Sequence, residues 1–199
     1  MFNLLDFQSF SVLESALAID IEKKFNFHKI PDNKNNYRCA QLPIDLCPLV
    51  WKNHGIDKVI RLNWDGEDGK HHENQSPVSI SDERDAAINL GIEFYKLSSD
   101  DPVDQEKINS LLSSGNCLVH CAHGADRTGG AVGGYLFKKK PNPSLSDTDQ
   151  IWKYSNQYNG WNKMVQSDPD KFDDKCYLGQ AKKFGVEDMN HALKLSRSK

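Results

Sequence analysis

The sequence predicts a single α/β domain in which a central, mostly parallel sheet is flanked by helices. Three short β-rich runs, residues 58–63, 92–97 and 116–120, carry this prediction. Each run follows a segment with helical signals, and strands that alternate with helices favour a parallel sheet covered on both faces. The chain shows no internal repeat and no linker between domains, so residues 1–199 are expected to form one domain.

The helices between these strands are predicted from residues that begin and end helices. Gly55 would end the helix before the first strand. Ser79 or Ser81 could cap the second helix, which would end at Gly91. Pro102 lies in the first turn expected for the third helix, a position that suits proline.

Composition limits the class of protein. Hydrophobic residues make up 38% and charged residues 27% of 199 residues, which is typical of a folded globular chain. The formal net charge of −3 argues against a broad nucleic-acid-binding surface. No apolar stretch approaches the roughly 20 residues that span a bilayer. We therefore expect neither a nucleic acid nor a membrane as partner, and we expect a monomer.

Cysteine usage indicates the compartment. The five cysteines, at 39, 47, 117, 121 and 176, form an odd set without a CxxC pair. The first 20 residues lack the basic residues of a secretory signal. Both observations favour free thiols in a reducing cytoplasm.

The stretch "LVHCAHGADRTGG", residues 118–130, carries the chemistry. A strand would end at His120 and a helix would begin near Arg127 or Thr128, joined by a tight loop that Gly124 makes possible. Such a loop directs N–H groups into one concavity, and the helix N-terminus adds its positive dipole end. Arg127 supplies a planar fork for two phosphate oxygens. Cys121 would lie in the same electropositive cup, where the thiolate is favoured and can act as a nucleophile.

The segment "HCAHGADRTG" resembles the signature of the protein tyrosine phosphatase superfamily, in particular small bacterial-type members of its dual-specificity branch. Residues 26–43 are similar to the family's opening strand, with Cys39 where serine is usual. The likeness covers roughly residues 26–140, and residues 141–199 are expected to form a C-terminal helical section. The resemblance implies a cysteine phosphatase that needs no cofactor and no metal.

The resemblance also implies roles for individual residues. Cys121 would be the nucleophile, His120 would support the loop by hydrogen bonds, and the Thr128 hydroxyl would donate to the thiolate. The transferred phosphate would be held by Ala122, His123, Gly124, Ala125, Asp126 and Arg127.

A general acid for the leaving oxygen is expected in "LSSDDPVDQ". By resemblance Asp101 aligns best, and Asp100 is the close competitor. An alternative interpretation is that these aspartates only cap the helix that begins near Pro102. Asp65, in "NWDGEDG", is better explained by turn chemistry.

Substrate choice rests on the variable loop positions. Asp126 would repel additional phosphates, and only His123 could attract them. This favours a phosphorylated protein or peptide, with phosphotyrosine above phosphoserine or phosphothreonine. Two alternatives stay open: an inositol-phosphate or phosphoinositide phosphatase, and a phosphoprotein-binding module with weak turnover.

Overall fold

The structure is a computed structural model that describes residues 24–65, 78–124, 126–139 and 150. Its strands are β1 (His28–Lys29), β2 (Tyr37–Ala40), β3 (Lys58–Arg61), β4 (Glu93–Lys96) and β5 (Cys117–Cys121). Its helices are α2 (Cys47–Asn53), α3 (Ile80–Asn89), α4 (Pro102–Ser114) and α5 (Asp126–Lys138). Each of the three strands predicted from the sequence is present.

The five strands form one sheet in the order β1-β2-β5-β3-β4. Strands β2, β5, β3 and β4 run parallel, and only the short β1 pairs antiparallel with its neighbour β2. The predicted α/β fold with a mostly parallel sheet is therefore confirmed. Because the four parallel strands run the same way, they all end at one side of the sheet, which we call its carboxyl end. Their first residues lie at the opposite side, the amino end.

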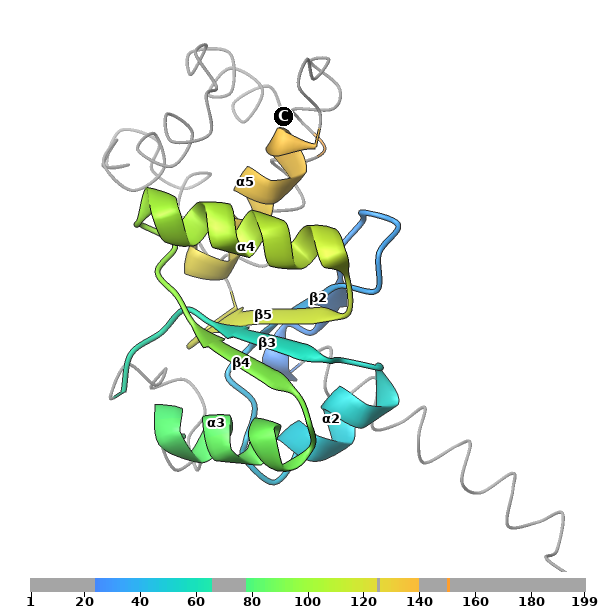
Figure 1. Ribbon diagram of the computed structural model, residues 1–199, viewed down its shortest axis with the longest axis vertical. Helices are drawn as coiled ribbons and strands as arrows, with labels where there is room; N and C mark the ends of the chain where they lie inside the picture. The colour runs from blue at the N-terminus through green and yellow to red at the C-terminus, as the bar shows by residue number, and fades with distance from the viewer. Residues whose placement is uncertain (1–23, 66–77, 125, 140–149, 151–199) are drawn as a thin grey trace, which may run out of the picture.

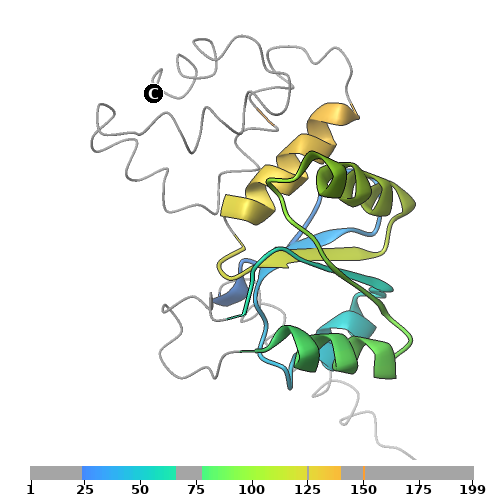
Figure 2. The same ribbon diagram turned by 60° about the vertical axis from the view of Figure 1, so that its left-hand side comes forward.

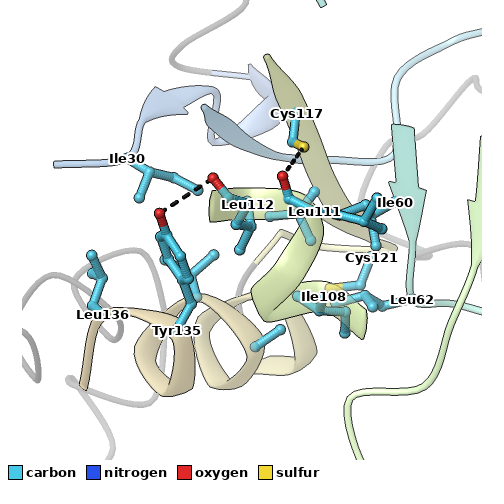
Figure 3. Packing of buried hydrophobic residues seen from close by; sticks show 13 residues of the cluster. Ile30, Ile60, Leu62, Ile108, Leu111, Leu112, Cys117, Cys121, Tyr135 and Leu136 are labelled. Atoms are coloured by element: carbon cyan, nitrogen blue, oxygen red, sulfur yellow. Dashed lines mark hydrogen bonds between the residues drawn. The ribbon is translucent and has the colours of Figure 1, made fainter. Parts of the chain in front are cut away.

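Helices cover both faces of the sheet (Figures 1 and 2). Helices α4 and α5 pack on one face, and α2 and α3 lie on the other. Side chains alternate along a strand, so Cys117, Val119 and Cys121 of β5 join the apolar cluster under α4 and α5 (Figure 3), whereas Leu118 joins the cluster on the opposite face. The residue next to Cys121, His120, consequently points toward the α3 side.

The helix ends follow the residues that predicted them. Ser79, one of the two candidate caps, accepts a hydrogen bond from the backbone N of Asp82 at 3.0 Å. Gly55 and Gly91 follow α2 and α3 with φ values of 61° and 72°, which glycine adopts without strain. Helix α5 begins at Asp126, one residue earlier than expected.

Some expectations lie outside the described residues. These are the segment 1–23, the predicted C-terminal helical section 141–199 apart from residue 150, and the extent of the domain as a whole. Within the described residues, no helix is both long and apolar enough to cross a membrane.

Candidate active site

The predicted loop lies at the carboxyl end of the sheet. Cys121 is the last residue of β5, and α5 begins five residues later at Asp126. The side chain of Cys121 is 97% buried, with one side against the apolar cluster that includes Leu62 and Ile108 (Figure 3). Ala125 and the side chain of Asp126 are not among the described parts of the chain.

The carbonyl groups of the loop are tied to the elements around it. His120 O accepts from Leu62 N at 2.8 Å and Ala122 O accepts from Gln41 N at 3.3 Å. Two side chains bind the next two carbonyls: Asn26 Nδ2 donates to His123 O at 2.8 Å, and Arg38 Nη2 donates to Gly124 O at 2.8 Å. In a trans peptide the N–H points opposite to the C=O, so outward carbonyls turn the following N–H groups inward. This is the arrangement that binds an anion.

Gly124 is fixed by its surroundings as well as by its backbone. Its φ is +64°, and a Cβ there would lie 2.4 Å from the backbone N of Ala40 and 2.4 Å from the carbonyl carbon of Cys39. The loop therefore packs directly on β2, whose fully buried Arg38 holds the Gly124 carbonyl. The sequence predicted the tight turn, and the close approach to β2 is the additional reason for glycine.

Arg127 lies in the first turn of α5 and is half-buried. Its Nη1 donates to the carbonyl of Leu62 at 3.3 Å, just beyond the end of β3. The guanidinium therefore lies at the carboxyl end of the sheet, beside the loop that holds Cys121. Thr128 is completely buried on the next position of the helix.

A buried ionic network lies behind the loop, and the sequence did not predict it. His120 Nε2 lies 3.0 Å from Glu83 Oε1, and Arg61 Nη1 lies 2.9 Å from Glu83 Oε2. Burial by itself raises the pKa of the Glu83 carboxyl, but the charges and hydrogen bonds of His120 and Arg61 outweigh it and the pKa is lowered. The available signal was an arginine inside the otherwise apolar run 58–63, since a charge there needs a buried partner.

Several of the unpaired buried polar atoms lie at the carboxyl end of the sheet. Each of the four parallel strands is followed there by such an atom, which has no hydrogen-bond partner within the described structure: Gln41 Oε1, Asn63 Nδ2 and Oδ1, Ser99 Oγ and Thr128 Oγ1. Buried polar groups are almost always paired, so this clustering indicates a place for a ligand or water. Open α/β sheets bind ligands at this end.

The two candidate acids lie in the loop between β4 and α4, at the same end of the sheet. Asp101 is the N-cap of α4, and its Oδ1 accepts from Val103 N at 2.7 Å and Asp104 N at 3.2 Å. The capping interpretation is therefore correct for Asp101, and an additional acid role stays a prediction. Asp100 is exposed and does not cap the helix. Asp65 accepts from Ile80 N at 2.6 Å, a structural contact at the start of α3.

Among the residues that the structure describes, no group of three or more histidine, cysteine or acidic side chains could hold a metal ion. The adjacent histidines 71 and 72 lie outside these residues.

Comparison with known proteins finds similar chain folds only among solved structures. No family model and no curated protein matches. A DUF442 protein from Shewanella putrefaciens CN-32 is 19% identical, with a TM-score of 0.48, over 75% of this chain and 95% of that one. The Yvh1 phosphatase domain from Chaetomium thermophilum is 15% identical, with a TM-score of 0.46, over 82% and 96%. The catalytic core of Siw14, a PP-IP phosphatase from S. cerevisiae, is 16% identical, with a TM-score of 0.44, over 82% and 94%.

Phosphatases are among the structural neighbours of this chain. Similarity at this level concerns the path of the chain. The chemistry follows from the residues of the site.

Proposed function

We propose that this chain hydrolyses phosphate monoesters through a phosphocysteine at Cys121, with phosphotyrosine in proteins or peptides as the preferred substrate. One observation carries the proposal: the three loop carbonyls of Ala122, His123 and Gly124, directly after β5, are all bound from outside the loop. This supports a cup of inward N–H groups with Cys121 at its base. A phosphate held by these donors and by Arg127 presents its phosphorus to the sulfur.

The reaction has two displacements at phosphorus. In the first, the Cys121 thiolate forms an S–P bond while the ester P–O bond breaks, and the leaving oxygen takes a proton from an aspartic acid. In the second, the resulting carboxylate removes a proton from water, whose oxygen attacks phosphorus and returns the electron pair of the S–P bond to sulfur. Arg127 and the loop N–H groups stabilise the charge on the equatorial oxygens in both steps.

The aspartates differ in what the acid role would require of them. Asp101 would have to exchange its two cap hydrogen bonds for one to the leaving oxygen, whereas Asp100 is not the cap of α4. Asparagine caps a helix about as well as aspartate but cannot supply the proton. An asparagine variant therefore removes the general-acid function of the residue and keeps its capping function.

We expect Asp101→Asn to lower kcat for a phosphotyrosine peptide by about 10²- to 10⁴-fold, the usual contribution of a general acid. The thermal midpoint should stay close to that of the native chain, because the cap is kept. Asp100→Asn is the matched control and should change kcat little. If only Asp100→Asn lowers kcat, Asp100 is the acid; if neither does, the proton comes from elsewhere.

The preference for an aryl phosphate rests on the rim of the site. Trp64 follows the buried Asn63 at the carboxyl end of the sheet and is 58% exposed. The Nζ of Lys96, the last residue of β4, lies 3.6 Å from the centroid of its ring. An exposed indole beside the cup supports stacking with a phenyl ester. Asp126 in the loop disfavours polyanions such as inositol polyphosphates.

The first test is hydrolysis of p-nitrophenyl phosphate without added metal, from pH 5 to 8, by the native chain and by Cys121→Ser. Activity that disappears in the folded variant would support phosphocysteine chemistry. A panel of phosphotyrosine, phosphoserine and phosphothreonine peptides and inositol phosphates then tests the substrate class; a preference for inositol phosphates would reject our choice. A reduced, folded native chain that binds phosphopeptide without turnover would be a binding module.

A further inference from the structure

Glu83 is a buried carboxylate that contacts His120, the residue before Cys121. It lies on α3, is 2% exposed, and each of its two oxygens contacts a different side chain. Oε2 is held by Arg61 Nη1 at 2.9 Å, and Oε1 lies 3.0 Å from His120 Nε2. His120 is bonded to Cys121, so the carboxylate is two groups away from the reacting sulfur.

The ion pair with Arg61 is by itself enough to balance the negative charge of Glu83. The arginine is itself fixed by two further contacts, since Nη1 also donates to Val78 O at 3.0 Å and Nε donates to Asn63 O at 3.2 Å. It therefore holds the carboxylate in one position, with the second oxygen directed at His120. An ionised carboxylate can only accept hydrogen bonds, so Glu83 can engage Nε2 of His120 only when this nitrogen carries a proton.

We propose that Glu83 is a positioning residue for the cysteine chemistry: it fixes the Nε2 proton and the orientation of His120, and through His120 it favours the thiolate of Cys121. This inference rests on the proposed role of Cys121 as nucleophile. Carboxylates that orient a functional imidazole in this way set its tautomer. The neighbouring strand supplies the opposite charge, so the buried network stays balanced.

The other titratable and charged groups near Glu83 do not take over its contact with His120. Cys39 of β2 and Cys47 of α2 also lie close enough to interact with Glu83, and Asp65 Oδ1 lies 3.6 Å from Arg61 Nη2. Burial, and to a lesser degree the charge of Glu83, raises the pKa of the Cys39 and Cys47 thiols, which therefore stay neutral. Glu83 is the carboxylate that contacts His120.

The sign of the expected effect follows from distance. A carboxylate alone would repel a nearby thiolate, so removing it would favour the thiolate. His120 contacts Glu83 and is joined to Cys121 by a peptide bond, however, so in this proposal its ring, with the proton held there, acts on the sulfur from nearer than the carboxylate does. Because charge interactions weaken with distance, losing the held proton outweighs losing the carboxylate. Glu83→Gln should therefore disfavour the thiolate.

The test is alkylation of Cys121 by iodoacetamide in the reduced full chain, from pH 5 to 9, followed by mass spectrometry of the Cys121 peptide. Only the thiolate reacts. We expect Glu83→Gln to slow the reaction about tenfold at pH 6 and to leave it unchanged at pH 9. Asp85→Asn, an exposed position on the same helix, is the matched control and should match the native chain.

A second arm asks whether Glu83 acts through His120. In a His120→Asn background, the additional change Glu83→Gln should have no further effect on the alkylation rate. An unchanged or faster rate in Glu83→Gln alone, or an equal slowing in the His120→Asn background, would overturn the proposal.

The native chain offers a measurement that does not depend on a variant that folds. Nitrogen NMR of the imidazole should show Nε2 of His120 protonated from pH 6 to 8, and a bare Nε2 would also overturn the proposal. Alkylation and NMR need no substrate. If both results are as expected and no phosphate ester is hydrolysed, the proposed function fails and this inference stands.

Discussion

Strand β5 begins and ends with the same residue type, yet its two cysteines have opposite surroundings. At the amino end, the Cys117 thiol donates to Leu111 O at 3.2 Å and to Gly115 O at 3.4 Å, and burial raises its pKa to about 12. At the carboxyl end, Cys121 leads into a loop whose N–H groups face inward. The two residues are both cysteines of the same strand, so residue type does not explain the difference in their surroundings. The difference comes from the end of the sheet at which each thiol lies.

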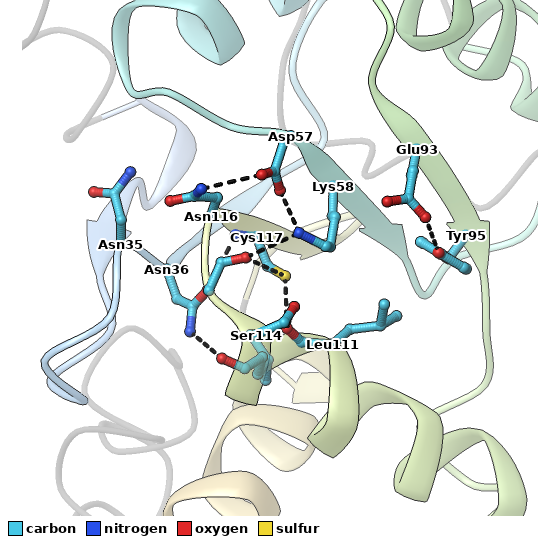
Figure 4. Close-up of polar contacts among 12 residues, drawn as sticks. Asn35, Asn36, Asp57, Lys58, Glu93, Tyr95, Leu111, Ser114, Asn116 and Cys117 are labelled. Atoms are coloured by element: carbon cyan, nitrogen blue, oxygen red, sulfur yellow. Dashed lines mark hydrogen bonds and ion pairs between the residues drawn. The ribbon is translucent and has the colours of Figure 1, made fainter.

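The contrast extends to the polar groups of both ends. At the amino end they pair with one another (Figure 4): Asn116 Nδ2 donates to Asp57 Oδ2 at 3.0 Å, Lys58 Nζ to Asp57 Oδ1 at 2.6 Å, and Asn36 Oδ1 accepts from Cys117 N at 3.0 Å. At the carboxyl end, several buried polar atoms have no partner in the described part of the chain. Paired groups stabilise the fold, whereas unpaired ones mark where a ligand belongs.

The largest expected difference between the two ends is in thiol reactivity. At neutral pH a thiol with a pKa of about 12 is alkylated on the order of 10³-fold more slowly than an ordinary thiol. Iodoacetamide at pH 7.5 should therefore modify Cys121 in the folded native chain and leave Cys117 unmodified. Peptide mass spectrometry over time measures both rates, with the urea-unfolded chain as the control in which the rates converge. Similar rates in the folded chain would remove the contrast.

A smaller effect is expected from two glycines with similar positive φ values. Gly124→Ala adds a Cβ 2.4 Å from the β2 backbone, so strain and overpacking together should cost about 3 kcal/mol in the free energy of unfolding. Gly91→Ala has nothing within 4 Å and should cost about 1 kcal/mol for the backbone conformation alone. Urea unfolding measures both. Equal losses would mean that the loop can move away from β2.

Sequence patterns predicted the sheet and the tight loop after β5 because both depend on local signals. The apolar runs gave strands β3, β4 and β5, and glycine, arginine and cysteine at fixed spacing gave the loop. The supporting contacts come from residues far away in the chain, such as Asn26 with His123, 97 residues apart, and Arg38 with Gly124, 86 residues apart. No local pattern encodes which carbonyl such a side chain reaches.

The burial of Glu83 could not be predicted from local sequence patterns either. In the sequence it is one of several acidic residues in a helix with a polar surface, and only its packing against β3 and β5 buries it. The charge of Arg61 within a strand indicated a buried partner, but eight other acidic residues in the described chain from residue 45 to residue 101 could have served as well. Tertiary packing selected one of them.

The smallest effect compares two buried asparagines at opposite ends of the sheet. Asn36 donates to Leu112 O and to Asp32 Oδ2, both at 2.7 Å, and accepts from Cys117 N. Asn36→Ala should therefore lower the free energy of unfolding by about 2–3 kcal/mol, because it leaves buried groups unpaired. Asn63→Ala removes two polar atoms that lack partners in the described residues, so the relief offsets the lost packing and we expect a change within about 1 kcal/mol.

Activity should separate these two variants in the opposite direction. At a temperature where both are folded, Asn36→Ala should keep the native kcat/KM for an aryl phosphate, because it lies at the far end of the sheet. Asn63→Ala should lower kcat/KM, since Asn63 follows β3 at the end of the sheet where the substrate would bind. Urea unfolding and steady-state kinetics on the same preparations measure both quantities. If Asn63→Ala proves the less stable variant and keeps full activity, unpaired polar atoms do not mark the site in this fold.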